Sequence, residues 1–145
     1  MGKDFEPKIM VFVCNWCPLG AVDSASRTAL PRKAQIKVLR VLCSGMVDPG
    51  YVMKAFASGA DGVVVIGCPL GNCHYISGNI KALRRAYLLR NLLVGLGVEE
   101  ERFRLEWIAH AEQHLYVEVV QEMSQRLREL GRLVVPGLFR ARGKF

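Results

Sequence analysis

The chain has 145 residues, of which 51% are hydrophobic, so it is the size of a single domain with one buried core. Its longest apolar runs, such as residues 63–70, are far shorter than the roughly 20 residues needed to span a bilayer, and its N-terminus mixes acids and bases, so we expect a cytoplasmic protein without a signal peptide or a membrane span. The formal net charge of +7 would suit nucleic acid, an anionic surface or an acidic protein, but the basic residues are scattered over expected helix faces without interleaved aromatic residues; we therefore expect a protein-docking surface and no nucleic-acid partner.

The first two predicted strands are short apolar runs. Residues 8–13 are rich in Ile and Val and read as a buried strand that ends at Cys14. A loop containing Pro18 and Gly20 is expected to follow it. Residues 36–42 repeat the apolar pattern, and the Ser and Gly that come soon after them are expected to break the second strand.

A helix and a central strand are predicted next. Asp48 supplies a capping carboxylate, Pro49 suits the first helical turn, and Gly59 is placed to end the helix. Residues 61–67 contain a continuous run of β-branched side chains. Such a run is typical of a central parallel strand that is covered on both faces.

The second half of the chain reads as helix, strand and helix. Residues 79–96 have helical periodicity, with an apolar stripe and with arginines elsewhere. Residues 103–108 alternate as a fourth strand, and residues 112–130 place apolar side chains at helical spacing until Gly131 stops them. The stripe of the first of these two helices consists of Ile80, Leu83, Tyr87 and Val94.

Strands that alternate with helices predict an α/β fold: a small doubly wound parallel sheet of about four strands, Rossmann-like or flavodoxin-like, with helices on both faces. We expect residues 1–131 to form this single domain and residues 132–145 to form a basic C-terminal tail. A glycine-rich phosphate fingerprint does not follow the first strand, because residues 14–20 hold cysteines instead.

All five cysteines follow predicted strands. The carboxyl ends of parallel strands share one edge of a sheet, which is where open sheets build their sites, so we expect the thiols to gather there. One cysteine at a strand end needs no explanation, since cysteine behaves as a small hydrophobe. Five at one edge indicate metal ligation or redox chemistry. They are Cys14 and Cys17 after the first strand, Cys43 after the second, and Cys68 and Cys73 after the third.

Three chemistries fit this set of thiols. An iron–sulfur cluster needs four thiolates and leaves one cysteine spare. Cys14 and Cys17 are spaced to grip one metal, and the four residues between Cys68 and Cys73 resemble a spacing of plant-type two-iron ferredoxins. Zinc also favours four thiolates, which would make the protein a zinc-binding interaction module. A thiol-disulfide oxidoreductase that uses Cys14 and Cys17 as a redox dithiol is the third alternative.

Other residues near the cysteines are candidates for supporting roles. Glycines would let backbone amides approach the sulfurs, where hydrogen bonds tune the potential. Trp16 is placed to shield a cluster from water or to contact a partner, and His74 is expected to be a loop residue beside the ligands rather than a ligand. The glycines in question are Gly20, Gly45, Gly67 and Gly71.

With these residues the sequence resembles the delta, iron–sulfur subunit family of methyl-viologen-reducing (F420-non-reducing) hydrogenase, which is associated with heterodisulfide reductase. The likeness extends from Lys8 to about Leu130. Its specific segments are residues 14–17, 41–48, 59–75, 78–79 and 101–108.

The resemblance implies a [2Fe-2S] protein that relays electrons between a hydrogenase or formate dehydrogenase and a flavin-containing, heterodisulfide-reductase-like subunit. It implies no catalytic residue in this chain, so we expect a non-catalytic subunit of an oxidoreductase complex. The family's five cysteines correspond to Cys14, Cys17, Cys43, Cys68 and Cys73.

Overall fold

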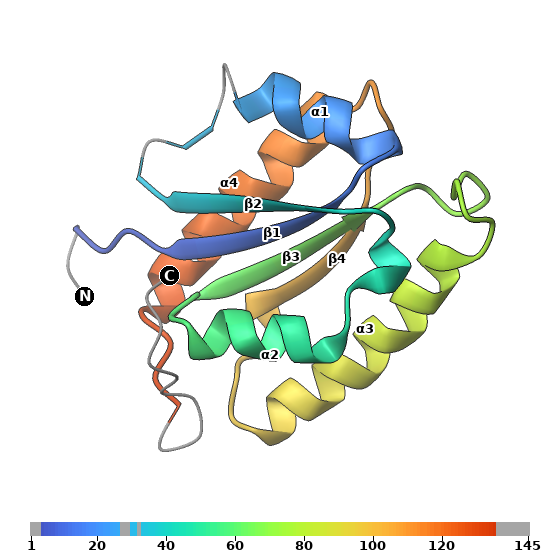
Figure 1. The fold of residues 1–145 in the computed structure, drawn as a ribbon. Coiled ribbons are helices and arrows are strands. Elements are labelled where there is room, and N and C mark those ends of the chain that lie inside the picture. Colours follow the sequence, from blue (N-terminus) through green and yellow to red (C-terminus); the bar gives the residue numbers. More distant parts are fainter. Residues whose placement is uncertain (1–3, 27–29, 32, 136–145) are drawn as a thin grey trace.

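Four parallel strands form one sheet: β2 (Gln35–Val41), β1 (Lys8–Cys14), β3 (Gly62–Gly67) and β4 (Phe103–Trp107), in that spatial order. The computed structural model describes residues 4–26, 30–31 and 33–135. β1 pairs with β2 on one side and with β3 on the other, and β3 pairs with β4 (Figure 1). The arrangement confirms the predicted α/β sheet, and its order is that of the flavodoxin-like type.

Two helices cover each face of the sheet (Figure 1). α1 (Cys17–Ser26) and α4 (Gln113–Leu130) pack on one face, and α2 (Pro49–Ala57) and α3 (Gly78–Gly95) pack on the other. Short 3₁₀ helices, η1 (Ser44–Met46) and η2 (Glu100–Arg102), precede α2 and β4. None of the helices in the described part of the chain has the length and apolar character of a membrane span.

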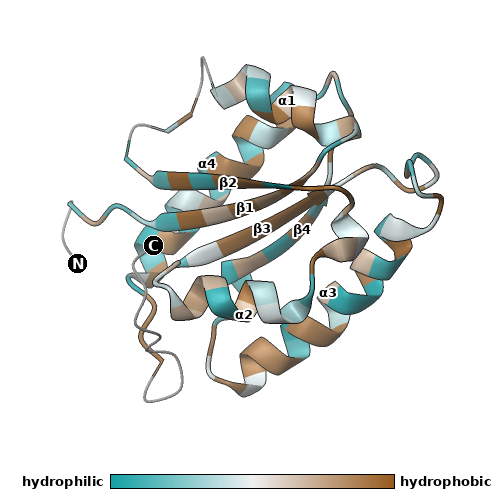
Figure 2. Cartoon of the chain, viewed as in Figure 1, coloured by the Kyte–Doolittle hydropathy of each residue, from teal (hydrophilic) through white to brown (hydrophobic). Residues whose placement is uncertain are grey.

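The core lies on both sides of the two central strands. Every residue of β3 is buried. Because side chains alternate along a strand, Val64 and Ile66 pack toward α1 and α4, whereas Val63 and Val65 pack toward α2 and α3. Figure 2 shows the hydrophobic residues concentrated along β1 and β3. The prediction of a central strand covered on both faces is confirmed.

The loop predicted after the first strand is wrong, because α1 begins there at Cys17. Pro18 stands in the first turn of α1, where its missing N–H leaves no hydrogen bond unmade. Gly20 is not a turn residue: a Cβ at this position would collide with the imidazole ring of His110. The helix is stabilised by apolar side chains that it buries, namely Ala21, Val22 and Ala25.

The apolar stripe of α3 faces outward. Ile80, Leu83, Tyr87 and Val94 are all exposed. The buried face of α3 contains small side chains that allow the helix to lie close to its neighbours. The apolar stripe in the sequence therefore does not mark the face of α3 that packs on the core. Its buried residues are Gly78, Asn79, Ala82, Ala86, Leu89 and Leu93.

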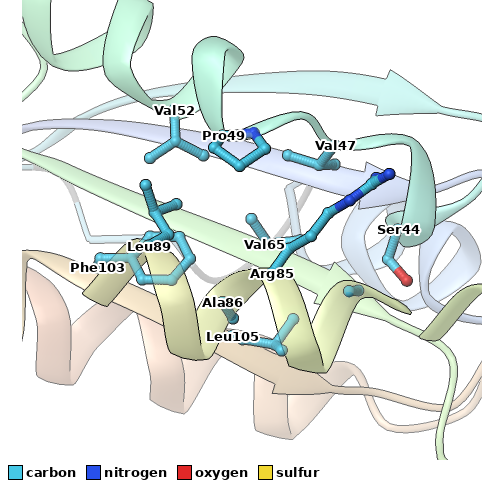
Figure 3. A pocket seen from close by; sticks show the side chains of 11 residues that line it. Ser44, Val47, Pro49, Val52, Val65, Arg85, Ala86, Leu89, Phe103 and Leu105 are labelled. Atoms are coloured by element: carbon cyan, nitrogen blue, oxygen red, sulfur yellow. The ribbon is translucent and has the colours of Figure 1, made fainter. Parts of the chain in front are cut away.

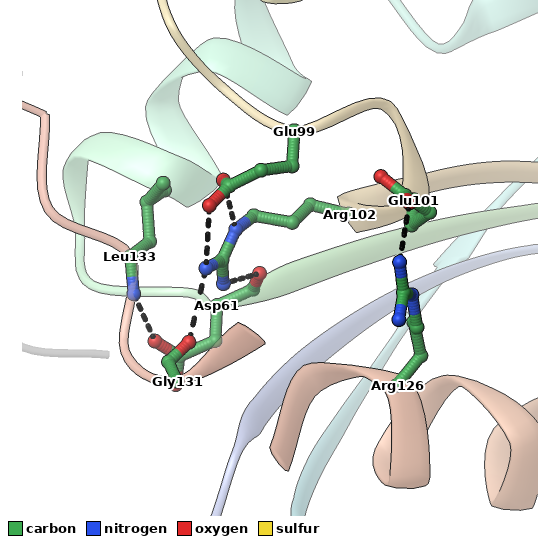
Figure 4. A network of polar contacts seen from close by, with 7 residues as sticks. All are labelled: Asp61, Glu99, Glu101, Arg102, Arg126, Gly131 and Leu133. Carbon is green, nitrogen blue, oxygen red and sulfur yellow. Dashed lines mark hydrogen bonds and ion pairs between the residues drawn. The ribbon is translucent and has the colours of Figure 1, made fainter. Parts of the chain in front are cut away.

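A buried arginine closes the amino-terminal edge of the sheet (Figure 4). Arg102 is 1% exposed, and its Nε donates to the Glu99 carboxylate over 2.6 Å. The other guanidinium nitrogens donate to the carbonyl oxygens of Asp61 (3.1 Å) and Gly131 (3.0 Å). A buried charge costs little only when it is paired and hydrogen-bonded in this way.

Asp61 extends this network to both ends of the domain. Its carboxylate accepts hydrogen bonds from the backbone N–H of Lys8 (2.9 Å) and of Leu133 (3.1 Å). Leu133 and Val135, two apolar residues at the start of the expected tail, pack against the core beside α2 and α3, whereas Val134 between them is exposed. The rest of that tail, residues 136–145, lies outside the described residues.

Candidate metal centre

The thiols gather where the strand order reverses. Chain connections leave β1 toward β2 on one side and later return to place β3 on the other side. Open α/β sheets bind ligands at this point, outside the carboxyl ends of the strands. Cys14 is the last residue of β1, and Cys68 follows β3 directly. Figure 1 shows the segments that follow β1, β2 and β3 emerging at the same end of the sheet.

Four of the five sulfurs form two close pairs. The Sγ atoms of Cys14 and Cys68 lie 3.7 Å apart, and those of Cys43 and Cys73 lie 3.9 Å apart. None of the cysteines forms a disulfide. In the described part of the chain, no three His, Cys, Asp or Glu side chains are arranged around one ion position. The cysteines thus come together as two pairs, and neither pair joins sequence neighbours.

Cys17 belongs to neither pair, although its thiol hydrogen-bonds to Cys68. It is the first residue of α1, and its Sγ lies 3.7 Å from the carbonyl oxygen of Asn72, to which the thiol donates. Cys17 is partly exposed, whereas Cys14, Cys43 and Cys68 are buried. The thiol of Cys17 therefore lies at the outer side of the cysteine cluster.

Burial keeps three of the thiols protonated. It raises the pKa of Cys14 to about 12, with the neighbouring Cys68 and Cys43 thiols adding to the effect. Burial and the nearby Cys68 and Cys73 raise the pKa of Cys17 to about 11. The pKa of Cys43 is also raised, mainly by burial. Because metals bind thiolates, occupation of this site would release protons.

Cys73 has the opposite tendency. Its burial would raise its pKa, but backbone N–H groups of Asn79, Tyr75 and Gly78 donate to its sulfur, and the Cys43 thiol adds a further hydrogen bond, so that its pKa is lowered. Converging backbone amides at the start of a helix favour a negative charge. Cys73 is thus the thiol best prepared to bind a cation.

The four glycines that were predicted to let backbone amides approach the sulfurs have different roles. The backbone N–H of Gly45 donates to Cys43 Sγ over 3.4 Å. Gly67 packs against Ser44 and Trp107, where a Cβ would come within 2.8 Å of both side chains. Gly71 lies in a turn with φ of +90°, a conformation that favours glycine, and Gly20 packs against a histidine ring.

Two residues that pack directly around the cysteines, Gly78 and Asn79, were not predicted from the sequence as part of the site. We call them, together with the cysteine loops that they contact, the cradle. A Cβ on Gly78 would collide with Cys43 Sγ and lie 3.2 Å from Cys73 Sγ. The buried Asn79 donates from Nδ2 to the carbonyl oxygens of Cys68 (3.1 Å) and Pro69 (3.0 Å). Their appearance among the family-like segments was the only signal in the sequence that pointed to them.

Arg85 ties α3 to the loop that carries Cys43. Its guanidinium donates to the carbonyl oxygen of Gly45. The side chains of Arg85 and Ser44 both line a small pocket of about 10 Å³ between α2, η1 and α3 (Figure 3). The Ser44 hydroxyl is buried and has no hydrogen-bond partner among the residues that the structure describes.

Aromatic rings lie next to the thiols. The rings of Trp16 and His74 are stacked, with centroids 3.5 Å apart, and Tyr75 meets both of them edge-on. The backbone N–H of Trp16 also hydrogen-bonds to Cys14 and opposes the rise in its pKa. Trp16 therefore contacts the site through its backbone, while its ring and that of His74 stack on each other as exposed aromatic surface.

An apolar rim surrounds this edge of the molecule. We use the name for five exposed residues: Trp16, Leu42, Met46, Tyr75 and Ile76. Ile76 is 86% exposed and has φ of +70°, which is strained for a β-branched residue. Beside the rim is an open pocket of about 240 Å³ lined by Cys43 and Lys81 among others. Exposed apolar surface of this kind is typical of a protein-docking site.

Known proteins are similar in sequence to most of this chain. A family model described as "Methyl-viologen-reducing hydrogenase, delta subunit" matches residues 9–131. The chain is 47% identical over 131 residues to an F420-non-reducing hydrogenase iron-sulfur subunit of Archaeoglobus profundus, covering 90% of this chain and 96% of that protein. It is 39% identical over 131 residues to an F420-non-reducing hydrogenase vhc iron-sulfur subunit of Methanococcus voltae, covering 90% and 91%.

Longer proteins contain a similar region. The chain is 36% identical over 125 residues to a subunit of the ferredoxin/F(420)H(2)-dependent CoB-CoM heterodisulfide reductase of Methanosarcina acetivorans. That match covers 86% of this chain but only 16% of the longer protein. The resemblance seen in the sequence is confirmed by these comparisons.

Proposed function

The chain belongs to the family of methyl-viologen-reducing hydrogenase delta subunits, and we propose that within an oxidoreductase complex it carries one [2Fe-2S] cluster and transfers single electrons. The chain itself performs no substrate chemistry in this proposal. The single observation that carries the proposal is the arrangement of four sulfurs in two close pairs.

The distances within the pairs fit two ligands on one metal ion. Metal–sulfur bonds of about 2.3 Å at tetrahedral angles place two thiolates on the same ion about 3.8 Å apart. The Cys14–Cys68 and Cys43–Cys73 separations of 3.7 and 3.9 Å agree with this value. A [2Fe-2S] cluster has two such irons, whereas one zinc ion would draw all four sulfurs together and a [4Fe-4S] cluster would give each thiolate its own iron.

The surroundings of the pairs also fit a cluster. When bound, the cluster would supply a one-electron carrier. Gly78 leaves space for the sulfurs, and backbone N–H groups donate to Cys43 and Cys73, which stabilises the negative charge of a cysteine-ligated cluster. Buried cysteines exclude water from one side, while the partly exposed Cys73 lies near the surface, where a partner can approach.

We propose that redox subunits of two kinds bind at the apolar rim. In the longer relatives, a region similar to this chain is part of a protein that is named as a heterodisulfide reductase component. This favours, as one partner, a flavin-containing subunit that is heterodisulfide-reductase-like, and a hydrogenase or formate dehydrogenase is proposed as the other. The exchange of electrons would take place in the cytoplasm.

The alternative of a redox dithiol formed by Cys14 and Cys17 gains no support from the geometry. Reactive dithiols need a lowered pKa and access to solvent. Cys14 is 2% exposed, and the pKa of both thiols is raised.

The test is anaerobic purification followed by metal, sulfide and spectroscopic analysis. We expect two irons and two acid-labile sulfides per chain, with visible absorption that bleaches on reduction and an electron paramagnetic resonance (EPR) signal of one unpaired electron in the reduced protein. A colourless protein with one bound zinc would overturn the proposal and leave the zinc-stabilised interaction module.

A further inference from the structure

We propose that Cys14 and Cys68 bind one iron, that Cys43 and Cys73 bind the other, and that Cys17 is the spare cysteine, acting as a positioning residue for the loop that carries Cys73. This assignment rests on the proposed function, because it presumes a two-iron cluster. It identifies the non-ligand among five candidates that the sequence left equivalent.

The two pairs come from two structurally different parts of the edge. Cys14 ends β1 and Cys68 directly follows β3, and these two central strands are adjacent, so the register of the sheet itself holds the two cysteines together. Cys43 precedes η1, and Cys73 lies in the loop that leads to α3. The second pair is held by Gly78, whose missing side chain allows both sulfurs to approach the backbone.

Sequence spacing suggested a different grouping. Cys14 and Cys17 are separated by two residues and were expected to be able to grip one metal. The chain turns into α1 at Cys17, and Cys14 is instead 3.7 Å from Cys68. In this assignment, the two thiolates on one iron therefore come from neighbouring strands and not from residues that are close in the sequence.

Cys17 belongs to neither close pair of sulfurs. Its Sγ donates to the carbonyl oxygen of Asn72 over 3.7 Å and also hydrogen-bonds to Cys68. A thiol-to-carbonyl contact does not by itself distinguish Cys17, because Cys14 Sγ makes one with Leu42 over 3.8 Å; the distinction is that Cys14 approaches Cys68 to 3.7 Å. Asn72 directly precedes Cys73. Cys17 therefore links the start of α1 to the loop next to one ligand, and it can hold that ligand in place without touching iron.

Alkylation of the intact protein tests whether Cys17 is free. The anaerobically purified holoprotein is treated with iodoacetamide, and the adducts are located by mass spectrometry while the visible spectrum is recorded. Because the raised pKa of Cys17 slows its reaction, the alkylation is followed over an extended time course, and we expect one adduct per chain, on Cys17, with the cluster absorption retained. An adduct on any other cysteine with absorption retained, or loss of absorption in step with alkylation of Cys17, would overturn the assignment.

Substitutions separate a positioning role from ligation. Cys17→Ser keeps a hydrogen-bond donor and is expected to retain two irons and the native EPR spectrum. Cys17→Ala is expected to retain two irons but to shift or broaden the EPR spectrum, because the loop at Asn72 loses its anchor. Cys73→Ser, the matched control in the same loop, should change the cluster absorption or lose iron. If Cys17→Ser behaves like Cys73→Ser, Cys17 is a ligand.

Mössbauer spectra test the pairing. In Cys14→Ser/Cys68→Ser, both oxygens should lie on one iron, giving one altered and one native-like signal of the oxidised cluster. In Cys14→Ser/Cys43→Ser, both irons should be altered. Should a double variant lose iron, the single variants decide: Cys14→Ser and Cys68→Ser should resemble each other and differ from Cys43→Ser and Cys73→Ser. The opposite grouping would refute the pairing.

Two kinds of failure are distinguishable. An unmodified protein that lacks iron and acid-labile sulfide after anaerobic purification refutes the proposed function itself. A protein that contains two irons but loses them in Cys17→Ser keeps the electron-transfer proposal and refutes only the ligand assignment.

Discussion

The amino-terminal and carboxyl edges of the sheet differ in how their buried polar side chains are hydrogen-bonded. At the amino-terminal edge, Arg102 and Asp61 are buried and hydrogen-bonded to carboxylates, carbonyls and backbone N–H groups of their own chain (Figure 4). At the carboxyl edge, buried thiols face one another, and the pKa of Cys14 and of Cys43 is raised by burial. A polar network whose groups are all hydrogen-bonded within the chain stabilises the fold, whereas a cluster of buried protonated thiols is suited to bind a ligand.

This difference separates residues that maintain the fold from residues that build the site. Changes at the amino-terminal edge should lower stability and leave the cluster as it is. Changes at the carboxyl edge should alter the cluster and leave the fold largely intact, since the core between α4 and β1 does not depend on the thiols.

The largest effect is expected from Gly78→Ala. The added methyl group would collide with Cys43 Sγ and crowd Cys73 Sγ, so one pair of ligands would be forced apart. We expect loss of the cluster, measured as iron content and visible absorption, with a native circular dichroism spectrum. Gly95→Ala at the other end of α3 is the control, because a Cβ there meets nothing within 4 Å. Normal iron content in Gly78→Ala would contradict the described cradle.

Arg102→Met should have the largest effect on stability. It would leave two buried carbonyl oxygens and the Glu99 carboxylate without their donor, at a cost of about 3 kcal/mol in the free energy of unfolding. Urea denaturation measures this loss, and the cluster absorption of the folded protein should be unchanged. The control Arg126→Met removes an exposed arginine with two surface ion pairs and should change stability little. Equal losses in both variants would argue against a special role of the buried network.

The stability of the metal-free protein should fall at high pH. The pKa values of Cys14, Cys17 and Cys43 are raised in the folded chain above the ordinary value of 9.0, so the folded state retains protons that the unfolded state loses. This stabilisation is complete below pH 9 and is lost as the pH rises toward about 12, where Cys14 titrates. Cys73 acts in the opposite sense, but it is one thiol against three.

Urea midpoints at pH 7 and pH 10 measure this effect. The metal-free protein should be less stable at pH 10, and Cys14→Ala should show a smaller difference between the two values. In the cluster-loaded protein the ligands are already thiolates, and the unfolded chain takes up protons below the ordinary thiol pKa of 9.0, so the loss of stability at pH 10 should disappear and reverse in sign. An identical pH dependence with and without the cluster would contradict the ligand role of these thiols.

The smallest effect is expected from Arg85→Met, which removes the hydrogen bond to the Gly45 carbonyl and loosens the Cys43 loop. We expect two irons to be retained, a stability loss of about 1 kcal/mol, and faster removal of iron by a chelator. Arg84→Met, a change at the exposed neighbouring residue, serves as the control. Equal chelation rates in both variants would show that the Arg85 hydrogen bond does not support the site.

The sequence by itself determined the sheet, the edge at which the cysteines meet, and the family. Continuous β-branched runs and the Asp48–Pro49 helix start are local signals, and the structure confirms them: β3 is fully buried and Asp48 Oδ1 accepts from the Gly50 N–H over 2.7 Å. The cysteines were expected at one edge because parallel strands end there, which is a consequence of topology alone.

Only the tertiary structure decided which thiols pair, why α1 is a helix and which face of α3 is buried. Cys14 pairs with Cys68 because β1 and β3 are neighbours in the sheet, although 54 positions separate the two residues along the chain. Gly20 and Gly78 are required by a side chain that approaches from a distant segment, His110 in one case and Cys43 in the other. Such contacts depend on distances between elements, and no local pattern in the amino-acid sequence encodes them.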